Sequence, residues 1–124
     1  VSYANRIKEQ ILGVPHDAIE KNGVVSREVA CHMAKGALRV SGADIAVSVT
    51  GIAGPDPSEG GKPAGLSYIA LADKKHVWCI KLETGRSGDN REYNRYVTAS
   101  NALNLARLYL TGKLTAEEAE HDFD

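Results

Sequence analysis

The sequence predicts an α/β fold in which helices cover the faces of a mixed β-sheet. Long segments with apolar residues at helical spacing alternate with short segments of alternating apolar residues, and glycine or proline separates them. With 124 residues, 43% hydrophobic and 25% charged side chains, the chain has enough apolar material for one core, so we expect one domain.

The first elements are predicted to be short. Ile7, Ile11 and Leu12 recur at helical spacing, which predicts a helix over residues 5–12 that ends at Gly13. Another helical turn is expected over 16–21, and residues 23–25 are a candidate short strand.

A longer helix follows. Ser26 is a good N-cap, the apolar positions Val29, Met33 and Val40 keep one face, and Gly42 lies where a left-handed C-cap is needed. The sequence therefore predicts a helix from residue 27 to about residue 40.

Three strands are predicted next. Alternation of valines with small residues over 45–49 predicts a strand covered on both faces, and residues 56–62 form a loop without an apolar anchor. Residues 66–72 and 77–83 flank a charged turn, which predicts a β-hairpin.

The last long helix is expected over residues 90–110. Val97, Leu103, Ala106 and Leu110 form its predicted apolar stripe, and Gly112 ends it. Residues 113–124 are a separate acidic tail with a capping-box pattern, which predicts a short, loosely docked helix.

Charge and composition exclude several classes of function. Lys and Arg number 15 against 16 Asp and Glu, which gives no net field that would attract nucleic acid or an anionic membrane. The apolar runs are too short and interrupted for a membrane span. Cys31 and Cys79 have neither metal-ligand spacing nor a disulfide framework and are expected to be packed thiols, so we expect a cytoplasmic protein.

The segment Thr50-Gly51-Ile52-Ala53-Gly54-Pro55 is the most informative local feature. Glycines directly after a strand let backbone N–H groups approach an anion, which indicates a phosphate or oxyanion cradle. The same pattern also occurs in turns without a ligand, and this one matches neither a Walker loop nor a dinucleotide fingerprint.

Several charged residues are candidates for chemistry, each with a plainer alternative. Lys8 lies beside the apolar face of the first helix, where partial burial would lower its pKa and make it a base, although most helix lysines are solvated. Arg86, Arg91 and Arg95 cluster near the start of the last helix and could bind an anion or be surface charge. The histidines show no metal-ligand spacing, so no metal site is expected.

Six blocks of the sequence, in this order, resemble the C-terminal domain of the CinA family. They are Tyr3-x-Asn5-x-x-Lys8, Leu12-Gly13-Val14-Pro15, Gly23-Val24-Val25-Ser26-x-x-Val29-Ala30, Thr50-Gly51-Ile52-Ala53-Gly54-Pro55, Lys62-Pro63-x-Gly65-x-x-Tyr68-Ile69-Ala70 and Gly88-Asp89-x-Arg91-x-x-x-Arg95-x-x-Thr98. The resemblance implies a three-layer α/β/α sandwich over residues 1–112, incomplete at its N-terminus.

The resemblance also implies an activity. Members of that family deamidate nicotinamide mononucleotide to nicotinate mononucleotide and ammonia without a metal or organic cofactor, and homodimers or larger homo-oligomers are expected. A serine upstream of Tyr3 would be the nucleophile, with Lys8 as its base and Tyr3 positioning or relaying the proton. Asn5, the loop Thr50, Gly51, Ile52, Ala53 and Gly54, and Arg91 would contact the nucleotide.

This chain departs from the family pattern in its first residues, because it contains no serine before a Thr-Gly-Gly turn. A lysine base without its nucleophile cannot carry out acyl transfer, so the chain by itself is expected to need that segment for activity. The alternative is a nucleotide-binding or regulatory module that does no chemistry.

Overall fold

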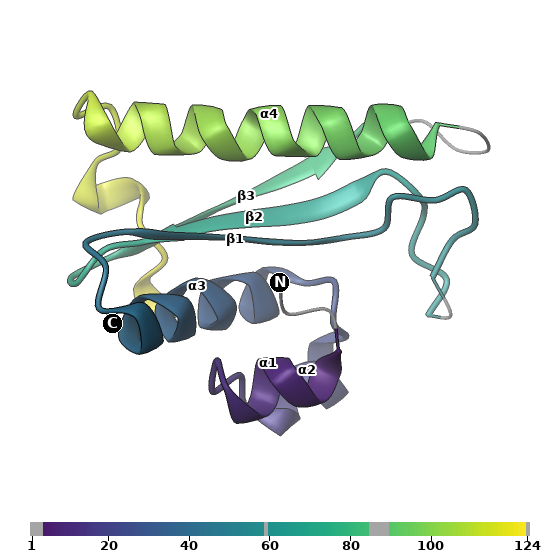
Figure 1. Cartoon of the computed structure of the whole chain (residues 1–124), viewed down its shortest axis with the longest axis horizontal. Coiled ribbons are helices and arrows are strands. Elements are labelled where there is room, and N and C mark those ends of the chain that lie inside the picture. The colour runs from purple at the N-terminus through teal and green to yellow at the C-terminus, as the bar shows by residue number, and fades with distance from the viewer. Residues whose placement is uncertain (1–3, 59, 85–89, 124) are drawn as a thin grey trace.

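A computed structural model describes residues 4–58, 60–84 and 90–123 of the chain. Helix α4 covers one face of a β-sheet, α3 covers the other, and α1 and α2 lie beyond α3 (Figure 1). The elements are α1 Asn5–Gln10, α2 His16–Asn22, α3 Arg27–Ser41, β1 Ala46–Gly51, β2 Leu66–Ala72, β3 Val77–Glu83, α4 Arg91–Leu110 and the 3₁₀ turns Ala116–Glu118 and His121–Phe123. The predicted three-layer order is confirmed.

The sheet has the order β1-β2-β3, and both neighbouring pairs are antiparallel. Val49 of β1 lies opposite Ile69 of β2, and Ile69 lies opposite Ile80 of β3. The parallel pairing that a mixed sheet requires is absent from these three described strands. The physical reason is that the connection between β1 and β2 contains no crossover helix among its described residues, so the chain turns back beside itself.

Two buried clusters hold the layers together because successive residues of β2 point to opposite faces. Between α3 and the sheet, the buried cluster consists of Ala30, Cys31, Ala34, Ala70, Ala72 and Val77. Between α4 and the sheet, it consists of Ile69, Leu71, Trp78, Leu105 and Ala119. Small residues at the α3 interface let that helix lie close to the sheet.

Helix α3 begins and ends as the sequence predicts. The Ser26 hydroxyl accepts a hydrogen bond from the Val29 amide at 3.3 Å and donates one to the Gly23 carbonyl at 2.9 Å. At the other end, Gly42 has a φ of 68°, a left-handed conformation that glycine adopts without strain.

Ser26→Ala is expected to lower the free energy of unfolding by about 1–2 kcal/mol, because it removes the N-cap of α3 and leaves the part-buried Gly23 carbonyl without its donor. Urea denaturation measures the effect. Ser100→Ala, at an exposed position of α4, is the matched control and should change stability by less than about 0.5 kcal/mol. Equal stabilities of the two variants would contradict the capping role.

Three local predictions were wrong. Residues 23–25 form no strand, because the carbonyls of Val24 and Val25 accept hydrogen bonds from the side chains of Thr50 and Lys62 instead of a neighbouring strand. β1 is not covered on both faces, since Val47 and Val49 are 38% and 40% exposed.

The predicted apolar stripe of α4 was the third wrong prediction. Leu103 and Leu110 are 74% and 73% exposed, whereas Leu105 and the polar Asn94 are buried. The buried face of α4 therefore does not include Leu103 and Leu110, because the first turn of the helix packs against the polar loop after β1 rather than against a core.

The acidic tail packs more closely than the sequence predicts. The expected capping box forms between Thr115 and Glu118, and the Thr115 carbonyl accepts a hydrogen bond from the Trp78 indole at 2.8 Å. Ala119 is buried, and Phe123 makes an edge contact with the His32 ring. The tail thus crosses the end of the sheet from α4 to α3 (Figure 1). Whether residues 113–124 form a unit separate from residues 1–112 stays a prediction.

Candidate active site along the edge of β1

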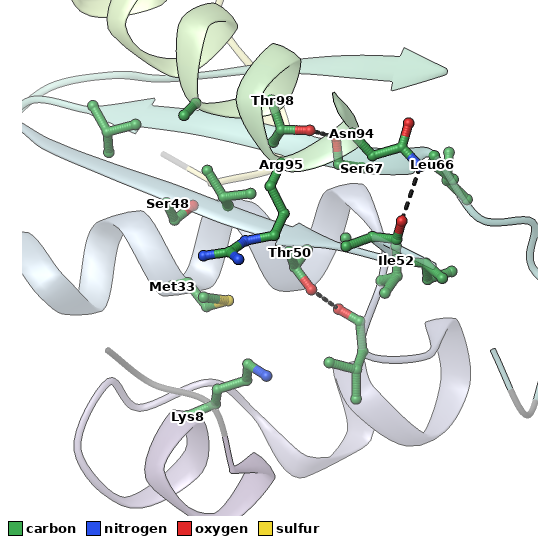
Figure 2. Close-up of a pocket in the computed structure, with 18 of the residues that line it drawn as sticks. Lys8, Met33, Ser48, Thr50, Ile52, Leu66, Ser67, Asn94, Arg95 and Thr98 are labelled. Atoms are coloured by element: carbon green, nitrogen blue, oxygen red, sulfur yellow. Dashed lines mark hydrogen bonds between the residues drawn. The ribbon is translucent and has the colours of Figure 1, made fainter. Parts of the chain in front are cut away.

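A groove with a volume of about 1310 Å³ runs along the edge of β1 that faces away from β2. Side chains of α1 and α3 form one wall and those of α4 the other (Figure 2). Its lining includes Asn5, Lys8, Met33, Val47, Val49, Thr50, Gly51, Ile52, Ala53, Asn94 and Arg95. The exposed side chains of Val47 and Val49 form the apolar floor of the groove, and Lys8 and Arg95 lie in its walls.

The loop after β1 is held in place by backbone and side-chain hydrogen bonds. The Ile52 amide donates to the Leu66 carbonyl at 2.9 Å, and the Ile52 carbonyl accepts from the Gly65 amide at 2.7 Å. Gly51 packs so closely that a Cβ there would lie 2.6 Å from the Cβ of Ser67. The described residues provide no acceptor for the Ala53 amide, so one N–H of the predicted cradle is available to a ligand.

Helix α4 clamps the same loop from the other side. Buried Asn94 donates from its amide nitrogen to the Ala53 carbonyl at 2.9 Å and accepts at its amide oxygen from the Thr84 hydroxyl at 2.6 Å. Arg91 donates to the Gly54 carbonyl at 2.9 Å. These bonds fix the loop at the N-terminal end of α4.

Lys8 is the most buried charged residue in the described groove wall, with 7% of its surface exposed. Desolvation by burial lowers the pKa of its amine from the usual lysine value. Figure 2 shows its amino group pointing from α1 toward Thr50 across the groove. The sequence left open whether Lys8 is buried or solvated, and the structure buries it, which gives a lysine whose neutral, basic form is easier to reach.

The hydroxyl groups of the β1 wall are engaged with the backbone. Thr50 donates to the Val24 carbonyl at 2.8 Å, and Ser48 donates to the Ala30 carbonyl at 2.5 Å. Both bonds tie β1 to the segment that begins α3. Thr50 therefore lines the groove and holds β1 in place, and its hydroxyl proton is already used in the hydrogen bond to Val24.

Arg95 belongs both to the arginine cluster and to the sixth family block of the sequence, and the structure gives it a more direct position at the groove than Arg91. Its guanidinium extends from α4 into the groove, on the side opposite Lys8 (Figure 2). Arg91, the arginine assigned to the substrate by resemblance, lies outside the described groove lining together with Gly54. Helical spacing explains the difference, because residues four apart lie on the same face but one turn further along the groove.

The remaining predicted site residues divide into two groups. Asn5, Thr50, Gly51, Ile52 and Ala53 line the groove together with Lys8. Tyr3 lies outside the described residues, as does Arg86. Asn94 was missed by sequence reasoning, because a buried asparagine in a helix carries no local signal for the loop it binds.

No cluster of three or more histidine, cysteine or acidic side chains suited to a metal ion occurs among the residues that the structure describes. Across the same part of the chain, every helix is too short or too polar to cross a bilayer. The groove instead offers two cations, Lys8 and Arg95, near one carboxylate, Glu92. That balance suits a small ligand that carries negative charge.

Fold and groove define an α/β/α domain with a candidate small-molecule site along the β1 edge of its described sheet. Residues 1–110 match the model of the CinA C-terminal domain, and the chain belongs to that family. Two curated relatives, both described as CinA-like proteins, are 46% identical to it. The relative from Geobacter sulfurreducens matches 86% of the chain, and the relative from Chlorobium limicola matches 89%. The chain spans about a quarter of the length of these relatives, 25% and 26%.

Solved structures agree with the fold. The chain is similar to a competence-damaged protein (CinA) superfamily structure from Escherichia coli, with 31% identity and a TM-score of 0.77, over 84% of this chain and 59% of that one. It is also similar to the competence/damage inducible protein CihA from Agrobacterium tumefaciens, with 38% identity and a TM-score of 0.75, over 84% of this chain and 62% of that one. Both comparisons support the three-layer α/β/α architecture.

Proposed function

We propose that the protein containing this domain is an amidohydrolase that converts nicotinamide mononucleotide and water to nicotinate mononucleotide and ammonia. Family membership and the groove support the proposal. The single observation that carries it is the buried amine of Lys8, which faces a groove that also receives an arginine and the glycine-containing loop after β1.

In the proposed reaction, Lys8 in its neutral form takes the proton of a serine hydroxyl, and the serine oxygen attacks the carboxamide carbon. In this proposal that serine lies upstream of Tyr3 in the sequence, and Tyr3 would position or relay the proton. The tetrahedral intermediate expels ammonia and leaves an acyl-enzyme, which water hydrolyses. Lys8 burial supports this assignment, since desolvation favours the neutral amine.

The groove supports the recognition of a nucleotide. The fixed loop would present the Ala53 amide to a developing oxyanion or to a phosphate, and Asn94 keeps that loop in place. Arg95 would pair with the phosphate. A groove of about 1310 Å³ has room for a mononucleotide and for a further polypeptide segment such as the one proposed to carry the serine.

The proposal is tested by measuring ammonia release from nicotinamide mononucleotide by the protein that includes the sequence preceding residue 1. Release coupled to stoichiometric nicotinate mononucleotide supports the amidase. Nucleotide binding without any ammonia release by a folded protein would favour the regulatory module instead. Sedimentation of the same sample tests the homo-oligomer, which stays a prediction.

Arg95→Gln is expected to raise the KM for nicotinamide mononucleotide roughly tenfold or more with little change in kcat, because it removes a charge-assisted contact to the phosphate. Nicotinamide riboside, which has no phosphate, should lose no affinity. Arg107→Gln is the matched control on α4, since the Arg107 guanidinium bonds to Asn104 outside the groove. Equal losses for both substrates would rule out the phosphate contact.

A further inference from the structure

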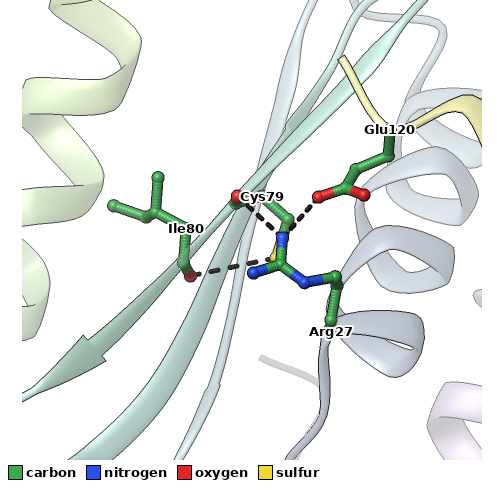
Figure 3. Close-up of polar contacts among 4 residues, drawn as sticks. All are labelled: Arg27, Cys79, Ile80 and Glu120. Atoms are coloured by element: carbon green, nitrogen blue, oxygen red, sulfur yellow. Dashed lines mark hydrogen bonds and ion pairs between the residues drawn. The ribbon is translucent and has the colours of Figure 1, made fainter. Parts of the chain in front are cut away.

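Cys31 and Cys79, 48 positions apart in sequence, meet in the structure between α3 and β3. Cys31 is fully buried in the cluster under α3, and Cys79 of β3 packs against that cluster. Both side chains therefore belong to one packed cluster, in which the Cys79 thiol donates to the Ile80 carbonyl at 3.8 Å (Figure 3). Cys79 is partly exposed, whereas Cys31 has no exposed surface.

Arg27 lies beside Cys79. Its guanidinium donates to the Cys79 carbonyl at 3.0 Å and forms an ion pair with Glu120 of the tail (Figure 3). Arg27 is the cation that acts on the Cys79 thiol, and the negative charges of Glu120 and Glu28 oppose its effect on the pKa of that thiol.

The surroundings of the two thiols shift their pKa values in opposite directions. The hydrogen bond from Cys31 and the Arg27 charge lower the pKa of the Cys79 thiol, while burial opposes them. The pKa of Cys31 is raised, because its proton is held in the hydrogen bond to Cys79 and its thiolate would be buried. A thiolate forms first at the residue that solvent can reach.

We propose that Cys79 is a modification site for low-molecular-weight disulfides, and that Cys31 then resolves the mixed disulfide into an internal cross-link between α3 and β3. Three observations carry the proposal: Cys79 packs against the cluster that contains Cys31, only Cys79 of the two is partly exposed, and the Arg27 guanidinium lies beside Cys79.

The redox step balances with the attacking disulfide as the oxidant. The Cys79 thiolate attacks one sulfur of the small disulfide, forms a mixed disulfide and releases one small thiol, which takes up the proton that Cys79 lost. The Cys31 sulfur gives up its proton and attacks the Cys79 sulfur, which releases the second small thiol. Two protein thiols are oxidised, and one small disulfide is reduced to two thiols.

Oxidised glutathione is the probe, and intact-mass spectrometry of the folded protein is the measurement. The wild type should lose two hydrogen masses, and digestion should yield a peptide that joins Cys31 to Cys79. Cys31→Ser should stop with one glutathione on Cys79. Cys79→Ser should remain unmodified while folded, because Cys31 is buried. Circular dichroism confirms that each variant is folded.

A second readout needs no variant. The cross-link restricts the unfolded chain, so the oxidised wild type should melt on the order of 10 °C higher than the reduced protein, and a reductant should reverse the shift. The proposal is overturned if the folded wild type stays unmodified while the urea-unfolded protein reacts. It is equally overturned if Cys79→Ser reacts at Cys31, or if the wild type accumulates the mixed disulfide without closing it.

Discussion

Lys8→Met is expected to lower the rate of ammonia release by roughly 10³-fold or more, because it removes the proposed general base. Methionine has a similar length and suits the buried position, so the fold should persist. Lys8→Arg distinguishes a base from a fixed positive charge, since a guanidinium cannot release its proton near neutral pH. A base predicts that both variants are inactive, and activity retained by Lys8→Arg would contradict that role.

The pH dependence gives an independent check on the same residue. The active form is the neutral amine, so kcat/KM should rise with pH through the pKa of Lys8 and level off above it. Because burial lowers that pKa, the rising limb should lie below the usual lysine range near 10.5. Lys74→Met, in the exposed turn between β2 and β3, is the control and should leave both the rate and the profile unchanged.

Gly36→Ala is expected to destabilise the protein by at least about 2 kcal/mol, although alanine normally stabilises a helix by up to ~1 kcal/mol over glycine. Gly36 lies inside α3, and a Cβ there would be 1.8 Å from the carbonyl oxygen of Leu12. The atoms that this Cβ would meet all belong to the Leu12 backbone, so no side-chain rotation relieves the clash. Thermal unfolding should show a Tm lower by roughly 8 °C.

The same substitution should also reduce activity, because the segment that Gly36 contacts follows α1, the helix that carries Lys8. Gly60→Ala is the matched control, since the nearest group to a Cβ there is the Ser58 hydroxyl at 3.9 Å. Its Tm should stay within about 2 °C of the wild type. A Gly36→Ala protein as stable as Gly60→Ala would show that α1 and α3 separate without cost.

Elements with strong local signals were predictable from sequence. The hairpin strands 66–72 and 77–83 have the predicted bounds, and α3 has the predicted caps at Ser26 and Gly42. Turn residues, caps and short-range periodicity act within a few residues, so they are encoded locally. The groove residues Asn5, Lys8 and 50–53 were predictable because they lie in short sequence motifs of the family.

Features that depend on partners distant in sequence could not be predicted. The buried face of α4 contains Asn94 and Leu105 rather than Leu103 and Leu110. Asn94 is buried because its side chain donates to the Ala53 carbonyl in the loop after β1. Arg91 and Arg95 look alike in sequence, yet one bonds to the Gly54 carbonyl and the other extends into the groove.

The sequence by itself determined the family, the α/β class and the residues that form the loop after β1, since these follow from local patterns and ordered motifs. Only the tertiary structure decided that Lys8 is desolvated, that Arg95 faces it, and that Cys79 packs against the cluster that contains Cys31. The physical reason is that desolvation, electrostatic pairing and thiol contact all depend on which segments the packed layers bring together, and helix spacing or strand alternation does not encode that.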